Sequence, residues 1–100
     1  MEMTDAIQLK LAQHFLPLVR RHIDDRNALK DLLALCEVAN EFASDDHSVT
    51  YDMTEYVQEC VAVAEGRGDA TWRDELLDVV EADIATLRDE WMRVARVCHV

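Results

Sequence analysis

The chain has 100 residues, half of them hydrophobic, and its 21 acidic and 10 basic residues give a formal net charge of −11. This hydrophobic fraction is too high for a disordered chain, and two glycines with one proline supply too few turns for a many-stranded sheet. No apolar run approaches the ~18 residues of a membrane span, and the acidic excess disfavours direct binding to nucleic acid or to an anionic membrane. We therefore predict a single all-α domain over residues 1–100, arranged as a four-helix bundle with a long C-terminal helix.

The first predicted helix begins after Thr4, whose side chain suits the N-cap position. Pro17 falls within this helix, where it removes an amide donor and clashes with the preceding turn. The sequence leaves open whether Pro17 kinks the helix or splits it. Helical spacing predicts an inner face made of Ile7, Leu11, Phe15, Leu18 and His22.

The second predicted helix is capped by Asp25 or Asn27 and runs to about Ala43. A polar loop follows over residues 44–48, and residues 49–51 are compatible with a short extended piece. The helix has a broad apolar face, which comprises Leu29, Leu32, Leu33, Cys36, Ala39 and Ala43.

The third predicted helix begins near Asp52, because Asp52 and Glu55 have the spacing of a capping box. Gly66 is predicted to follow its last turn, since glycine accepts the left-handed conformation required there. The predicted inner face comprises Met53, Tyr56, Val57, Cys60, Val61 and Ala64.

The fourth predicted helix follows a cap at Thr71 and carries an uninterrupted heptad seam. Since this helix is longer than the others, its far end must be covered either by the first helix or by a second copy of the chain. Trp91, Val94 and Cys98 are therefore candidates for a homodimer interface, and a helical homo-oligomerisation adaptor is one functional alternative. The full seam comprises Leu77, Val80, Ile84, Leu87, Trp91, Val94 and Cys98.

The cysteines Cys36, Cys60 and Cys98 cannot all pair within one chain and lack the spacing of a zinc site. The N-terminal segment lacks the apolar stretch of a secretory signal, so we expect reduced thiols in a cytoplasmic protein. No cofactor, metal site or catalytic residue is predicted, because the histidines have no ligand spacing and no glycine-rich phosphate loop is present.

The acidic residues are concentrated in the middle of the chain. Between residues 31 and 66 there are nine acids and no lysine or arginine, so ion pairs within this stretch cannot neutralise it. If the second and third helices pack antiparallel, their carboxylates form one acidic surface. Tyr51 is a candidate aromatic anchor within it, and Trp72 is a further aromatic candidate for a contact. The predicted partner-binding residues are Glu37, Glu41, Asp45, Asp46, Tyr51, Asp52, Glu55 and Glu59.

A concentrated negative charge favours a basic protein partner, because single-sign charge speeds association with a lysine- and arginine-rich surface. We therefore expect a non-enzymatic inhibitor that masks a basic, nucleic-acid-binding surface of a nuclease or related complex. Anti-CRISPR proteins, nuclease immunity proteins and antitoxins are classes of comparable size and charge. The simpler interpretation is that the acids serve solubility alone.

Residues 58–80 resemble the all-α nucleotide pyrophosphohydrolases of the MazG type. That family carries Glu-x-x-Glu on one helix and Glu-x-x-Asp on the next, and the four acids hold Mg²⁺ against a nucleoside triphosphate. Glu75 and Asp78 match the second half of this motif. The first half departs from it, because Ala62 stands three residues after Glu59. The resemblance implies a Mg²⁺-dependent pyrophosphohydrolase as an alternative function.

Overall fold

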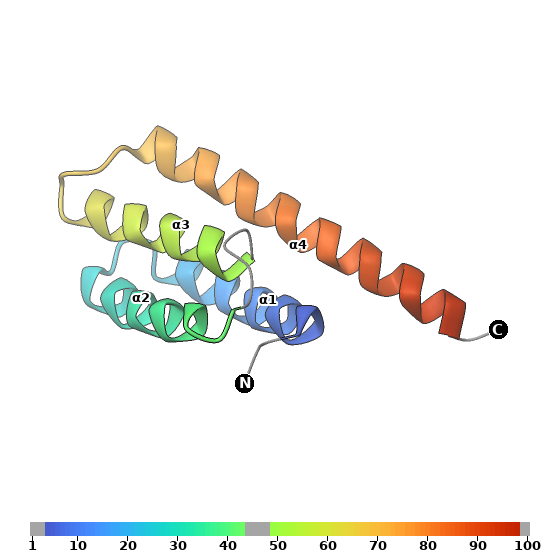
Figure 1. Ribbon diagram of the computed structural model, residues 1–100. Coiled ribbons are helices and arrows are strands. Elements are labelled where there is room, and N and C mark those ends of the chain that lie inside the picture. Colours follow the sequence, from blue (N-terminus) through green and yellow to red (C-terminus); the bar gives the residue numbers. More distant parts are fainter. Residues whose placement is uncertain (1–3, 44–48, 99–100) are drawn as a thin grey trace.

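The computed structural model describes residues 4–43 and 49–98, and for residues 94–98 the description is limited to the backbone. The described residues form four helices and no strand, which confirms the predicted all-α fold (Figure 1). The molecule is elongated, with extents of 53 × 27 × 22 Å, because the last helix continues beyond the other three. The helices are α1 (Asp5–Arg21), α2 (Arg26–Asn40), α3 (Val49–Ala64) and α4 (Ala70–Cys98).

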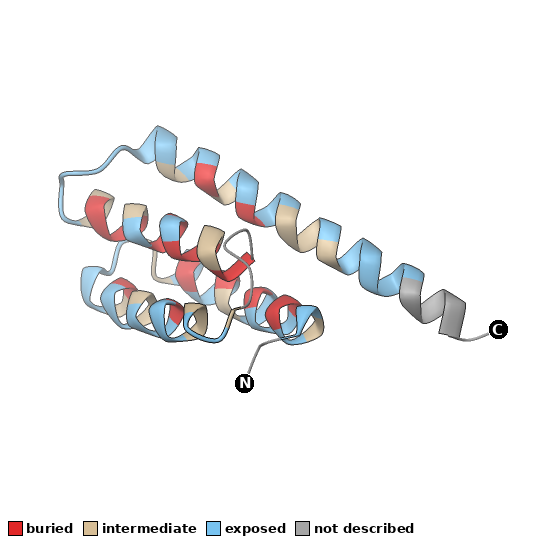
Figure 2. Cartoon of the chain, viewed as in Figure 1, coloured by how far each residue is buried: buried red, intermediate tan, exposed pale blue. Residues whose placement is uncertain are grey.

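Helix α3 is the centre of the bundle. It packs against α1, α2 and α4, while α1 also packs against α4. The burial pattern agrees, since α3 contributes more buried residues than either α1 or α2 (Figure 2). The predicted inner face of this helix is confirmed: Met53, Tyr56, Val57, Cys60 and Val61 are buried and Ala64 is half-buried.

Two predicted helix starts are confirmed by their caps. The Thr4 hydroxyl accepts a hydrogen bond from the Ile7 amide at 3.4 Å, and the Asp25 carboxylate accepts one from the Ala28 amide at 3.1 Å. Helix α1 continues through Pro17 and is not split there. Helix α2 ends at Asn40, and tighter hydrogen bonds between residues three apart carry the chain to residue 43.

The predicted starts of the other two helices are wrong. Helix α3 begins at Val49, so residues 49–51 are helical and Asp52 lies inside the first turn instead of capping it. Burial of Val49 and Thr50 against the core favours this earlier start. Helix α4 is capped by Asp69 and not by Thr71, because the Asp69 carboxylate accepts from the amides of residues 71 and 72 at 2.9 and 3.3 Å. The predicted loop over residues 44–48 lies outside the described residues.

The predicted inner face of α1 is wrong. Ile7, Leu11 and Leu18 are 49%, 42% and 43% exposed, whereas Phe15 and His22 are half-buried. The helix is apolar on two adjacent faces. It packs against α3 and α4 through the face that was not predicted to be the inner one. The residues buried on that face are Gln8, Leu9, Ala12, Leu16 and Val19.

The long helix α4 packs into the bundle through the first part of its predicted seam. Val80 is fully buried and Ile84 and Leu87 are partly buried, but Leu76, next to the predicted Leu77, is more buried than expected. Trp91 is 53% exposed even though the first turn of α1 reaches the pocket that Trp91 lines. In the part of the chain that the structure describes, no helix has an apolar stretch sufficient to cross a lipid bilayer.

Candidate functional site

The candidate site lies where α2 and α3 run antiparallel. At one end, the Asn40 side-chain amide donates to the Thr54 hydroxyl at 2.8 Å. At the other end, Arg26 and Lys30 of α2 approach the Glu65 carboxylate, just after α3, at 3.4 and 3.8 Å. The two helices therefore have the antiparallel arrangement on which the predicted acidic surface depends.

A groove runs over the outer side of α3. Glu55 and Glu59 line it together with Leu33 of α2, Arg67 of the turn after α3 and Trp72 of α4, around a volume of about 560 Å³. Glu55 is exposed and Glu59 is half-buried. Two carboxylates predicted for partner binding thus share one concave site with an aromatic ring that is 49% exposed.

The acids of α2 lie on the flank of the helix that carries Leu33. Glu37 follows Leu33 by one helical turn and Glu41 follows Glu37 by another, so the three residues lie on one flank of the helix. Since Leu33 lines the groove, this flank faces the groove side of the bundle. Glu37 and Glu41 are both exposed, and with Glu55 they form what we call the acidic surface.

The acidic surface is not neutralised within the described part of the chain. In residues 4–43 and 49–93, no lysine or arginine forms an ion pair with Glu37, Glu41 or Glu55. Arg26, Lys30 and Arg67 all pair instead with Glu65, at the opposite end of α2 and α3.

Glu65 is the carboxylate with which Arg26, Lys30 and Arg67 form ion pairs. Its pKa is lowered chiefly by a 3.0 Å hydrogen bond from the Arg67 guanidinium and then by the positive charges of Lys30, Arg67 and Arg26. This cluster joins the start of α2 to the turn after α3. The acid stretch is therefore divided into a neutralised end at Glu65 and an uncompensated end at the acidic surface.

Glu59 has a structural contact that sequence analysis missed. Its Oε1 accepts a hydrogen bond from the Asp69 backbone amide at 2.8 Å and so holds the turn between α3 and α4. The two glycines of the following turn indicate this contact in the sequence, because the backbone amides of such a turn need hydrogen-bond acceptors. Glu59 is accordingly less free to meet a partner than Glu55.

The other residues predicted for partner binding or dimerisation are not part of the acidic surface. Tyr51 and Asp52 are half-buried on α3, and both interact with other parts of the chain. Asp45 and Asp46 lie outside the described residues. Trp91 is exposed near the far end of α4, and the side chains of Val94 and Cys98 lie outside the description.

The buried thiols are poor nucleophiles. Desolvation raises the pKa of Cys36 to about 12 and that of Cys60 to about 11, so both stay protonated near neutral pH. Burial likewise raises the pKa of the neighbouring Tyr56 hydroxyl. Both thiols are free and belong to the hydrophobic core, and their packing accounts for their position.

The acids of the pyrophosphohydrolase resemblance are not gathered into one centre. Glu75 and Asp78 are exposed on α4, while Leu76 between them is buried against the bundle. Within the described ranges, no group of three or more His, Cys, Asp or Glu residues could hold a metal ion. These acids therefore do not meet Glu59 around a common Mg²⁺ position.

No protein-family model, no curated protein and no solved structure matches this chain. The function therefore has to be inferred from the surface itself.

Proposed function

We propose that this protein binds a basic protein partner through the acidic surface and masks lysine and arginine side chains that would otherwise contact nucleic acid. The observation that carries the proposal is the exposure of Glu37, Glu41 and Glu55 on adjacent helices, without a basic counterpart among the described residues.

The uncompensated charge has a cost for the folded chain. Like charges one helical turn apart, such as those of Glu37 and Glu41, destabilise a helix by about 0.2–0.5 kcal/mol per pair. The chain uses its nearby basic residues at Glu65 and not at this surface. Surfaces that serve solubility alone intersperse both signs, so the segregation of charge supports a binding role.

The groove beside the acidic surface suits a cationic side chain. An arginine that pairs with Glu55 would lie near the Trp72 ring, since both residues line the same groove. The chain's own cation in this groove, Arg67, is held in an ion pair with Glu65. Guanidinium groups form bidentate pairs with carboxylates and stack on indole rings. The same surface repels nucleic acid, so it would compete with phosphate groups for a basic protein and would not bind them.

The proposal is tested with a fluorescent arginine-rich peptide taken from an RNA-binding protein. We expect Glu37→Lys, Glu41→Lys and Glu55→Lys together to weaken its binding by about 10- to 100-fold at physiological salt, as expected for three exposed charge pairs of up to about 1 kcal/mol each. The matched control is Glu75→Lys, Asp78→Lys and Glu90→Lys on α4, which makes the same change in net charge on exposed positions.

Fluorescence anisotropy gives the affinity, and circular dichroism confirms that both variants are helical. A much smaller loss in the α4 control supports a defined surface, and addition of the wild-type protein should release RNA from the peptide in proportion to its concentration. Equal losses in the two variants would show a response to net charge alone, and unchanged binding in the first variant would remove the acidic surface as the site.

A further inference from the structure

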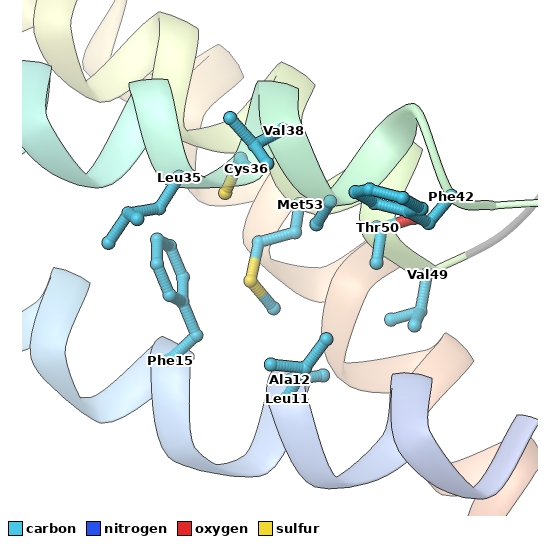
Figure 3. A pocket seen from close by; sticks show the side chains of 11 residues that line it. Leu11, Ala12, Phe15, Leu35, Cys36, Val38, Phe42, Val49, Thr50 and Met53 are labelled. Carbon is cyan, nitrogen blue, oxygen red and sulfur yellow. The ribbon is translucent and has the colours of Figure 1, made fainter. Parts of the chain in front are cut away.

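A second surface of the molecule is apolar and open. Helices α1 and α2 are separated by a groove of about 300 Å³ whose floor is formed by α3 (Figure 3). The side chains that line it converge from three helices, and they include Leu11, Phe15, Leu35, Val38, Phe42 and Met53.

The two sides of this groove consist of large apolar side chains that are exposed to solvent. Leu35 and Val38 of α2 are 60% and 53% exposed, and Phe42, just after this helix, is 46% exposed. On α1, Ile7 and Leu18 extend the row that contains Leu11, at helical spacing. These six apolar side chains are each between 42% and 60% exposed, and an exposed apolar patch of this kind is typical of an interaction site.

The charged residues beside the groove differ in sign between its two sides. Lys10 and Arg21 are exposed on α1, next to the row of Leu11 and Leu18. Asp31 is exposed on α2, one turn before Leu35. The α1 side, which we call the basic rim, thus carries two cations, and the α2 side, which we call the acidic rim, carries one carboxylate. A two-fold axis along the groove would place the basic rim of one copy on the acidic rim of another.

We propose that a second copy of this chain covers the groove, with α1 of each copy packed against α2 of the other. The pairing would bury the exposed apolar rows of both helices. The opposite charges of the two rims favour this occupant over a partner of uniform charge.

Glu37 of the acidic surface stays free in such a dimer. Glu37 follows Leu35 by two residues, which is about 200° around α2, so the two side chains leave the helix on opposite flanks. The dimer would present two acidic surfaces, and it could engage two basic sites at once with increased avidity. The proposal does not depend on the function of the acidic surface.

Sedimentation or light-scattering mass measurements over a wide range of protein concentration test the proposal. We expect the wild-type protein to be dimeric and Leu35→Glu to raise the dissociation constant by about tenfold or more, because the carboxylate would be buried in an apolar interface. Val79→Glu is the matched control, since Val79 is also an exposed apolar residue, at 46%, but lies on α4.

A charge exchange gives a second, independent readout. Lys10→Glu with Arg21→Glu should weaken the dimer, and the further change Asp31→Lys in the same chain should restore much of the affinity. A monomeric wild-type protein would overturn the proposal and leave the groove to a partner of another sequence. So would a dimer that survives Leu35→Glu but is dispersed by Trp91→Glu, because that result places the interface on α4.

Discussion

At the scale of single residues, the turn between α3 and α4 is the most constrained part of the chain. Gly66 has a φ of +80°, which confirms the position after the last turn that the sequence predicted for it. Gly68 is constrained by space and not by that angle: an added Cβ would lie 2.6 Å from the Val63 backbone nitrogen and 2.8 Å from Glu59 Oε1. The spacing of the two glycines shows a turn, but the contact at Gly68 arises only when the chain folds back on α3.

We expect Gly68→Ala to lower the free energy of unfolding by about 1–3 kcal/mol, because the methyl group must displace backbone atoms of α3. Urea denaturation of the two proteins measures the difference. Gly66→Asn is the comparison variant, since asparagine tolerates the left-handed conformation and an added Cβ at Gly66 meets nothing within 4 Å. A larger loss at Gly66 than at Gly68 would contradict the close approach.

At the scale of helices, the sequence was sufficient where only one face of a helix is apolar. The inner face of α3 was predicted because the acids Asp52, Glu55 and Glu59 fall outside it, although Thr50 and Thr54 are buried as well. Helix α1 carries two apolar rows, and periodicity could not tell the row buried at Leu16 and Val19 from the exposed row at Leu11 and Leu18. The choice depends on where α3 and α4 lie, which is tertiary information. The sequence could place acids on α2 and α3, but the capture of Glu59 by the Asp69 amide depends on the path of a turn.

The ion pairs at Glu65 connect two helices and make their junction sensitive to acid. The pKa of Glu65 is lowered below its ordinary value of 4.5 in the folded chain, so its ion pairs stabilise the fold above that pH and lose this contribution as the pH falls through the lower, folded-state value. We expect Glu65→Gln to unfold at a lower denaturant concentration than wild type at neutral pH, with a smaller difference in acid.

Denaturant midpoints measured from neutral pH to below pH 4.5 check this prediction. Glu75→Gln is the control for the loss of one carboxylate, because Glu75 is exposed and pairs with none of the described basic residues. The same pH dependence in both variants would contradict a contribution from the contacts of Arg26, Lys30 and Arg67 with Glu65.

At the scale of the whole molecule, charge and apolar surface are segregated. The net charge is −11, yet the described ion pairs of the basic residues at the α2–α3 junction converge on Glu65 and leave the acidic surface uncompensated. The exposed apolar groove lies on the other flank of α2. Helix α2 thus separates a charged surface from an apolar one. Unpaired negative charge favours a partner at the first surface, and exposed apolar area favours a partner at the second.

This arrangement predicts that the acidic surface lowers stability while it promotes binding. Replacing Glu37, Glu41 and Glu55 together by glutamine removes like-charge repulsion without removing an ion pair of the described chain, so we expect a higher unfolding midpoint at low ionic strength. Sodium chloride should raise the unfolding midpoint of the wild-type protein, because at 0.1 M it screens repulsion between charges more than about 10 Å apart. It should raise the midpoint of the variant less, because the variant has fewer like charges whose repulsion can be screened.

The measurement is thermal unfolding of both proteins across a series of sodium chloride concentrations, together with their affinity for the arginine-rich peptide. A variant that is more stable at low salt and binds the peptide more weakly would show that the same carboxylates cause both effects. If the variant were less stable than wild type at every salt concentration, these acids would be held by favourable contacts within the fold, and their availability to a basic partner would be refuted.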